Sequence, residues 1–143
     1  MAHRKSPFFE ELSHTADVAV RVRGRSLPEL FEHAALAMFQ LIAGGELERV
    51  PPLHEREVGV ASLDLESLLV DWLTELLVLF ATTGELVCRA RVTALEETRL
   101  RASVWTGPPP FEPYEDIKAV TYHDLRVEQD EEGTWWATIV FDV

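Results

Sequence analysis

Alternation of apolar and polar residues predicts most of the strands in this chain. Val18, Val20 and Val22 are separated by Ala19 and Arg21, and this period of two is typical of a strand that buries one face. A similar alternation near the end of the chain continues to the final residues. The pattern predicts strands at 18–23, around 58–60, at 86–92 and 100–104 as a hairpin, and at 117–128 and 134–142.

Two segments carry apolar residues at helical spacing. Ser26 and Glu29 form a capping box in front of the first segment, and Gly44 follows its last apolar residue. Asp64 is a good N-cap for the second segment, which extends to Gly84. The apolar stripe of this second helix is wide, so we expect the helix to pack across a sheet.

These elements indicate a single α+β domain that covers residues 1–143. Two helices would pack on a mostly antiparallel sheet of about six strands, with the strand order and any parallel pair left open. A chain of 143 residues is long enough to bury a core without disulfides. Residues 1–7 are expected to form a flexible tail.

The charge of the chain narrows the range of partners that it can be expected to bind. Its formal net charge is −12, and from residue 111 onward nine Asp or Glu residues stand against two basic ones. Affinity for nucleic acid comes largely from Lys and Arg on phosphates, so strong direct binding of RNA or DNA is not expected. A negative surface favours divalent cations and basic protein partners instead.

The sequence lacks the residues that a disulfide, a Cys-rich zinc site, a secretory signal or a membrane span would need. Cys88 is the only cysteine, which excludes an internal disulfide and a Cys-rich zinc site, and its place in a predicted strand favours an inert buried thiol. His33 and His54 stand alone in polar surroundings and are interpreted as surface histidines. The basic start is followed by no secretory signal, and no run of about 18 apolar residues could span a membrane. We therefore expect a cytoplasmic protein, monomeric or weakly oligomeric, that does not enter a membrane.

The tetrapeptide from His14 to Asp17 is the first candidate site. It precedes a predicted strand, where the simplest role of Thr15 or Asp17 is to hydrogen-bond nearby backbone amides in a turn. Asp17 also shares strand parity with the arginines that follow it rather than with the valines. Its carboxylate is therefore expected to point away from the core.

The last two residues are the second candidate. The strand pattern continues through Asp142 to Val143, so an ordered end would place the Asp142 side chain and the chain's own carboxylate within one residue of each other. Uncompensated, these negative groups would repel each other, whereas a hard cation such as calcium, which seeks about six to eight oxygens, could use both. Asp17 could add a third carboxylate if the two strands lie together. The alternative is a frayed, solvated end.

Basic residues offer weaker candidates. Lys118 and His123 could bind phosphate or transfer protons near an acidic site, or they could neutralise neighbouring carboxylates. Arg21, Arg23 and Arg25 could form a phosphate patch. Three cations on one strand face of an acidic protein are more often a solvated edge or partners of carboxylates.

Taken together, five stretches of the chain resemble the archease family. They occur in that family's order and spacing and span nearly the whole sequence. Ser13 stands where some relatives carry an acid, and the proline-rich loop 107–116 has no clear counterpart. The matching stretches are 13–18 (Ser-His-Thr-Ala-Asp-Val), 30–39, 64–73, 118–123 and 140–143 (Val-Phe-Asp-Val).

The resemblance implies a cytosolic accessory protein without turnover of its own. Its partner would be an RtcB-type RNA ligase of tRNA splicing and RNA repair, whose metal-dependent guanylylation and multiple turnover it would promote. The resemblance also implies a divalent-metal site, usually described with calcium. The ligands of that site fall here on Asp17, Asp142 and Val143.

Other residues and other functions stay open around this implied site. His14, Thr15, Lys118 and His123 are candidates for supporting the metal site or contacting the ligase. A metal-dependent phosphoester hydrolase would use the same carboxylates, with His14 or His123 as the base. A chaperone-like module for an RNA-modifying methyltransferase would not depend on Asp142.

Overall fold

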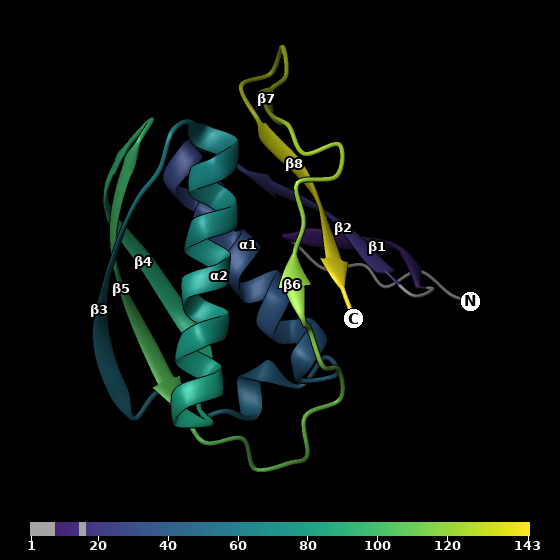
Figure 1. The fold of residues 1–143 in the computed structure, drawn as a ribbon, viewed down its shortest axis with the longest axis vertical. Coiled ribbons are helices and arrows are strands. Elements are labelled where there is room, and N and C mark those ends of the chain that lie inside the picture. The colour runs from purple at the N-terminus through teal and green to yellow at the C-terminus, as the bar shows by residue number, and fades with distance from the viewer. Residues whose placement is uncertain (1–7, 15–16) are drawn as a thin grey trace.

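The computed structural model describes residues 8–14 and 17–143, with only the backbone described at 11–14. Two long helices lie between two sheets and contact both (Figure 1). Within the described residues, no helix is both long and apolar enough to cross a membrane. In chain order the elements are β1 (Phe9–His14), β2 (Asp17–Gly24), α1 (Leu27–Ile42), the 3-10 turn η1 (Leu47–Arg49), β3 (His54–Ala61), α2 (Leu65–Thr83), β4 (Leu86–Glu96), β5 (Arg99–Gly107), β6 (Ala119–Val120), β7 (Val127–Gln129) and β8 (Trp135–Asp142).

Both sheets are antiparallel wherever their strands pair. The larger sheet has the order β1-β2-β8-β6, with β7 pairing β8 as well. The smaller sheet has the order β3-β5-β4. Within the described residues, the first strand β1 and the last strand β8 therefore share the larger sheet (Figure 1).

Helix α1 begins where the capping box predicts. The Ser26 hydroxyl accepts a hydrogen bond from the Glu29 backbone N–H at 3.2 Å. Gly24 ends the preceding strand so close to the helix that a Cβ there would lie 2.4 Å from the Leu30 backbone nitrogen. Only glycine therefore permits this strand-to-helix turn.

Helix α2 is bounded by the predicted N-cap and C-cap. The Asp64 side chain accepts from the Ser67 backbone N–H at 2.8 Å, and Gly84 closes the helix with φ 72°, a left-handed conformation that favours glycine. Trp72 is fully buried, and its indole N–H donates to the Phe31 carbonyl of α1 at 2.9 Å. This bond fixes α2 against α1 inside the core.

The core face of the larger sheet follows the predicted alternation. Val18, Val20 and Val22 of β2 are fully buried, as are Ile139 and Phe141 of β8. Of the residues of opposite parity in β2, Asp17 and Arg21 are exposed, whereas Ala19 and Arg23 are partly buried. The parity argument for an outward-pointing Asp17 is thus confirmed.

The predicted fold class is confirmed, but the strands are divided between two sheets instead of one. The segment 9–14, which forms β1, was not predicted because its sequence lacks a regular alternation. Its pairing with β2 shifts register between Glu11 and Ser13, as expected for a strand interrupted by a bulge.

The prediction of one strand over 117–128 is wrong. This segment forms two short strands, β6 and β7, joined by a turn. In that turn the Leu125 backbone N–H donates to the Tyr122 carbonyl at 3.1 Å, and Asp124 has φ 50°. A left-handed residue cannot continue a strand, so the alternation before it and after it belongs to separate elements.

Candidate functional site

Asp17 and Asp142 lie directly opposite each other in the larger sheet. Asp17 is the first residue of β2, Asp142 is the last residue of β8, and the register pairs them across the antiparallel ladder. Both residues are exposed. Directly opposed residues place their side chains on one face of a sheet, with Cβ atoms about 4.5–5.5 Å apart. The start of β2 and the end of β8 therefore meet at one acidic point.

Asp142 is held from its other side by the segment that leads into β6. Ala119 pairs with Asp142 in the register, and the Lys118 backbone N–H donates to the Asp142 carbonyl at 2.7 Å. The side chain of Val143 is partly buried and packs against the hydrophobic core. The last strand thus reaches Asp142 as predicted and is not a frayed end.

The electrostatics of this point favour a cation. Like charges directly opposite each other in a sheet are destabilising, so two facing carboxylates gain from a counterion. Hard cations such as calcium bind carboxylate and carbonyl oxygens, which is the chemistry that Asp17 and Asp142 offer. Among the described residues, however, no group of three or more His, Cys, Asp or Glu side chains is placed to hold a metal ion. Further oxygens would have to come from Val143, from backbone groups, from residues outside the described part of the chain or from another molecule.

Of the four supporting candidates, the structure describes Lys118 and His123 in full and His14 by its backbone alone. Lys118 is an exposed residue, and it adjoins Asp142 through its backbone. The backbone of His14 pairs with Val18 at the same end of the sheet. The side chain of His14 and the whole of Thr15 lie outside the described part of the chain.

His123 is not brought to the acidic point. It lies in the turn after β6, where its Nε2 is 3.3 Å from the Asp124 carboxylate. Its backbone N–H donates to the Thr121 hydroxyl at 3.3 Å, and the Thr121 backbone N–H donates to the Val140 carbonyl. His123 is therefore positioned further back along β8, away from Asp142.

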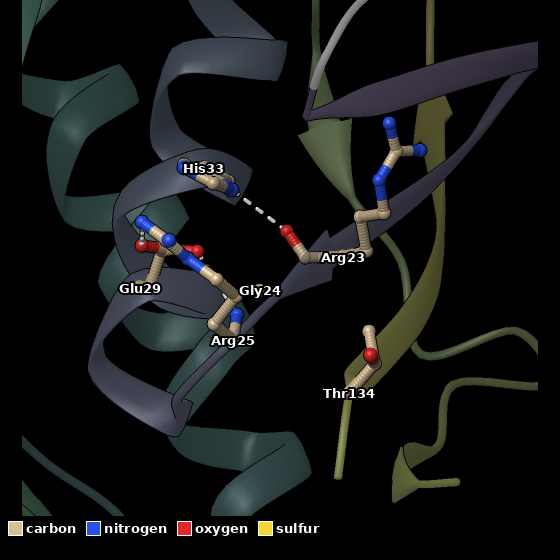
Figure 2. Close-up of a pocket in the computed structure, with 6 residues that line it drawn as sticks. All are labelled: Arg23, Gly24, Arg25, Glu29, His33 and Thr134. Atoms are coloured by element: carbon tan, nitrogen blue, oxygen red, sulfur yellow. Dashed lines mark hydrogen bonds and ion pairs between the residues drawn. The ribbon is translucent and has the colours of Figure 1, made fainter. Parts of the chain in front are cut away.

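The three arginines after Asp17 do not gather into one patch. The Arg21 guanidinium lies 4.2 Å from the centre of the Trp136 ring, a cation–π contact on the outer face of the sheet. Arg25 forms an ion pair with Glu29 at 3.4 Å. In Figure 2 the Arg23 side chain points away from that of Arg25.

A hollow of about 380 Å³ opens between the end of β2, helix α1 and the start of β8 (Figure 2). His33 Nδ1 forms a hydrogen bond with the Arg23 carbonyl oxygen at 2.7 Å, so the partly buried His33 links strand β2 to helix α1. The interpretation of His33 as a surface histidine is therefore wrong. The Arg25 backbone N–H and guanidinium hold the pKa of Glu29 below its usual value. These hydrogen bonds join the turn after β2 to helix α1. The polar residues around the hollow therefore already have a structural role. Its lining residues are Arg23, Gly24, Arg25, Glu29, His33 and Thr134.

A second polar cluster centres on Glu85 and was not foreseen. Its Oε1 accepts from the Thr106 hydroxyl at 2.7 Å and from the Arg56 guanidinium at 3.0 Å, and His54 Nδ1 lies 3.0 Å away. The Thr106 bond is the main cause that lowers the pKa of Glu85 to about 2. Its partners are 21 to 31 residues away in sequence, so no local pattern could have revealed the cluster. It ties β3 and β5 to the end of α2.

Cys88 fits the expected inert thiol. Its Sγ lies 3.5 Å from the Trp105 carbonyl, and burial raises the pKa of the thiol. A thiol with a raised pKa is a poor nucleophile at neutral pH.

Comparison with known proteins finds relatives from one protein family. The sequence profile of the "Archease protein family (MTH1598/TM1083)" matches residues 9–143. Protein archease of Pyrococcus abyssi is 39% identical over 142 residues, which cover 94% of this chain and 98% of that protein. Protein archease of Methanosarcina mazei is 42% identical, with 94% and 95% covered.

Two solved structures have the same fold. The solution structure of Methanobacterium thermoautotrophicum protein 1598 superposes with a TM-score of 0.76 at 32% identity, covering 94% of this chain and 98% of that one. The crystal structure of a Thermotoga maritima protein described as "an archease, possible chaperone" gives a TM-score of 0.64 at 24% identity over the whole of both chains. The latter comparison bears on the fold alone.

Proposed function

Because the chain belongs to the archease family, we propose that it is a non-enzymatic accessory protein of an RtcB-type RNA ligase in the cytoplasm. Its role would be to promote metal-dependent guanylylation of the ligase, so that the ligase turns over repeatedly in tRNA splicing and RNA repair. The observation that carries this proposal is the pairing of Asp17 with Asp142. The pairing supports a single acidic tip, formed by Asp17 at the start of β2 and Asp142 at the end of β8.

Asp17, Asp142 and Val143 would hold the divalent metal, for which calcium is the expected ion. The two side chains offer carboxylate oxygens on one face of the sheet, and Val143 offers its carboxylate if the chain ends there. A bound divalent ion would supply positive charge, which lowers the repulsion between the acidic groups and attracts phosphate oxygens. Asp142 would be the best ordered ligand, because β2 and β6 hold its backbone from both sides.

The position of the tip suits delivery to a partner. Asp17 and Asp142 are exposed at the end of paired strands, so they can reach a recessed surface without unfolding of the core. The net charge of −12 would steer the molecule toward a positively charged partner surface. Lys118 is the best placed of the candidate partner contacts, since it is exposed next to Asp142.

Multiple-turnover ligation tests this function directly. An RtcB-type ligase would be assayed with excess RNA in the presence of the wild type, Asp17→Ala or Asp142→Ala. Glu131→Ala is a matched control, because it removes one negative charge from an exposed residue of the turn at the opposite end of β8. We expect stimulation by the wild type and the control and little by the two tip variants. Equal stimulation by all four proteins would rule out the proposed role of the tip.

A chaperone-like role, one of the functions that the sequence leaves open, is the second candidate. It predicts that the chain protects an RNA-modifying methyltransferase from aggregation and that Asp142→Ala protects equally well. Light scattering of the heated methyltransferase with each variant separates this role from ligase activation. The hydrolase alternative predicts turnover of phosphoesters by the isolated protein with added metal.

A further inference from the structure

The outer face of the smaller sheet carries four of the chain's thirteen basic residues. Leu100, Ala102 and Val104 of β5 are buried on the side of the helices. The opposite face presents a set of exposed arginines to solvent, namely Arg89 and Arg91 of β4 and Arg99 and Arg101 of β5. This concentration is unusual in a chain of net charge −12.

The register arranges these arginines in a line. Arg91 pairs with Ser103 and Arg89 pairs with Trp105, both beyond Arg101 in the direction of β5. The sequence of rows along the sheet is therefore Arg99, Arg101, Arg91, Arg89, which crosses from β5 to β4. At about 3.4 Å per residue, the line is roughly 20 Å long. We call this line the arginine track.

A hollow of about 430 Å³ adjoins the start of the track. On β3, Gly59 pairs with Arg101 and Ala61 pairs with Arg99, so small residues flank these two arginines on that side, while Glu96 of β4 pairs with Arg99 on the other side. A Cβ built on Gly59 would find open space, its one neighbour within 4 Å being the Leu100 carbonyl oxygen at 3.9 Å. A group the size of a phosphate can thus approach both guanidinium groups.

Acidic side chains on the same face reduce the positive charge of the arginine track but do not neutralise it. Within the described part of the chain, no ion pair within 4 Å engages Arg91, Arg99 or Arg101. The acids of the same face are Glu55 and Glu57 of β3 and Glu96 of β4, and the Glu57 carboxylate accepts a hydrogen bond from Ser103 at 3.0 Å. Four cations against three anions leave a locally positive strip.

The far end of the track carries an aromatic ring. Trp105 is partly exposed, and the Arg89 guanidinium lies 5.6 Å from its ring centre. Arginine guanidinium groups bind phosphate oxygens in a bidentate manner, and aromatic rings stack on unpaired bases. A line of cations that ends at an indole ring fits an extended polymer better than a single phosphate group.

We propose that the arginine track binds the sugar-phosphate backbone of single-stranded RNA, with phosphates at Arg99 and Arg101 and a base next to Trp105. The proposal rests on the proposed function, because RNA is the substrate of the partner ligase. Alone, the acidic chain binds RNA weakly, in keeping with its net charge. In a complex with the ligase, the high effective concentration of the strand makes a weak contact useful.

Fluorescence anisotropy of a labelled single-stranded oligouridylate tests the track on the full chain without any ligase. The assay is run at low salt, where binding through phosphates is strongest. Arg99→Ala/Arg101→Ala is expected to weaken binding about tenfold and to reduce the slope of log K against log salt by about 1.4, or 0.7 per lost contact. The matched control is Arg25→Ala/Arg49→Ala, which removes two exposed arginines already paired with Glu29 and Glu46. This control should weaken binding less than about threefold.

Gly59 supplies a second, independent variant. Gly59→Glu places a carboxylate in the open space beside Arg101 and should weaken binding as much as the double arginine variant, whereas Gly59→Ala should bind like the wild type. Circular dichroism checks that each variant is folded. An equal loss with both double arginine variants, or no binding at all at low salt, overturns the proposal. Competition by GMP or inorganic phosphate at concentrations equal to those of the RNA phosphates also overturns it, since the site would then bind a single phosphate.

The tip and the track are separable in these measurements. Asp142→Ala should retain RNA binding, while Arg99→Ala/Arg101→Ala should retain calcium binding. Failure of the ligation test therefore leaves the anisotropy result informative, and the reverse also holds.

Discussion

Replacing Asp142 with asparagine should change stability in opposite directions with and without calcium. The substitution keeps the size of the side chain and removes one of two carboxylates that face each other across β2 and β8. Removing a like-charge pair from a sheet stabilises the folded state by about 0.2–1 kcal/mol. Because both residues are exposed, we expect a value in the lower half of this range, about 0.5 kcal/mol. At about 3–4 °C per kcal/mol for a chain of this size, Asp142→Asn should melt about 2 °C higher than the wild type in a chelator.

Calcium should reverse this order. A ligand at about 100 times its Kd stabilises the folded state by about 2.7 kcal/mol, which raises the melting temperature of the wild type by about 8–11 °C. Asp142→Asn should gain far less, since it lacks one proposed ligand. The assay is thermal unfolding followed by circular dichroism at low salt, and added salt should shrink the difference seen in the chelator. If Asp142→Asn melts lower in the chelator, or gains as much from calcium as the wild type, the electrostatic account of the tip is wrong.

Three further variants test the fold that positions the tip. Trp72→Phe removes a fully buried indole and its hydrogen bond to the Phe31 carbonyl. It should lower the free energy of unfolding, measured in urea, by about 2–3 kcal/mol. A loss below about 1 kcal/mol would contradict the described packing of Trp72. Gly107→Ala places a Cβ 1.7 Å from a backbone carbonyl oxygen of the loop before β3, so it should destabilise the folded state by about 2 kcal/mol or more. Gly59→Ala should be nearly neutral, and equal melting temperatures for the two variants would refute this prediction. Glu85 has a pKa lowered from 4.5 to about 2, so its contribution is complete above pH 4.5 and lost as the pH falls through about 2. The stability gap between the wild type and Glu85→Gln, measured in urea, should therefore narrow on acidification, and a gap that is constant from neutral pH to about pH 2 argues against the cluster.

Elements with strong local signals could be predicted from the sequence. The capping box at Ser26, the N-cap at Asp64 and the left-handed Gly84 act on neighbouring backbone groups, so short patterns reveal them. The period of two in β2 predicted the exposure of Asp17 for the same reason. Separation of the strands into two sheets depends on long-range pairing, which no local alternation encodes.

The candidate site divides in the same way. Parity and chain order favoured Asp17 and Asp142 as separate acidic residues, but their register is set by the whole length of β2 against β8. The split of 117–128 at Asp124 moved His123 away from the tip, because one left-handed residue ended the strand. Glu85 gained partners on β3 and β5 that only the folded chain brings near.

Calorimetric titration of calcium tests most directly whether the two chain ends form one metal site. The protein that ends at Val143 would be compared with a version extended by a few residues after Val143 and with one extended before Met1. We predict that extension after Val143 weakens calcium binding about tenfold or more, which corresponds to about 1.4 kcal/mol, and that extension at the start changes nothing. Identical calcium affinity for all three proteins would contradict the account.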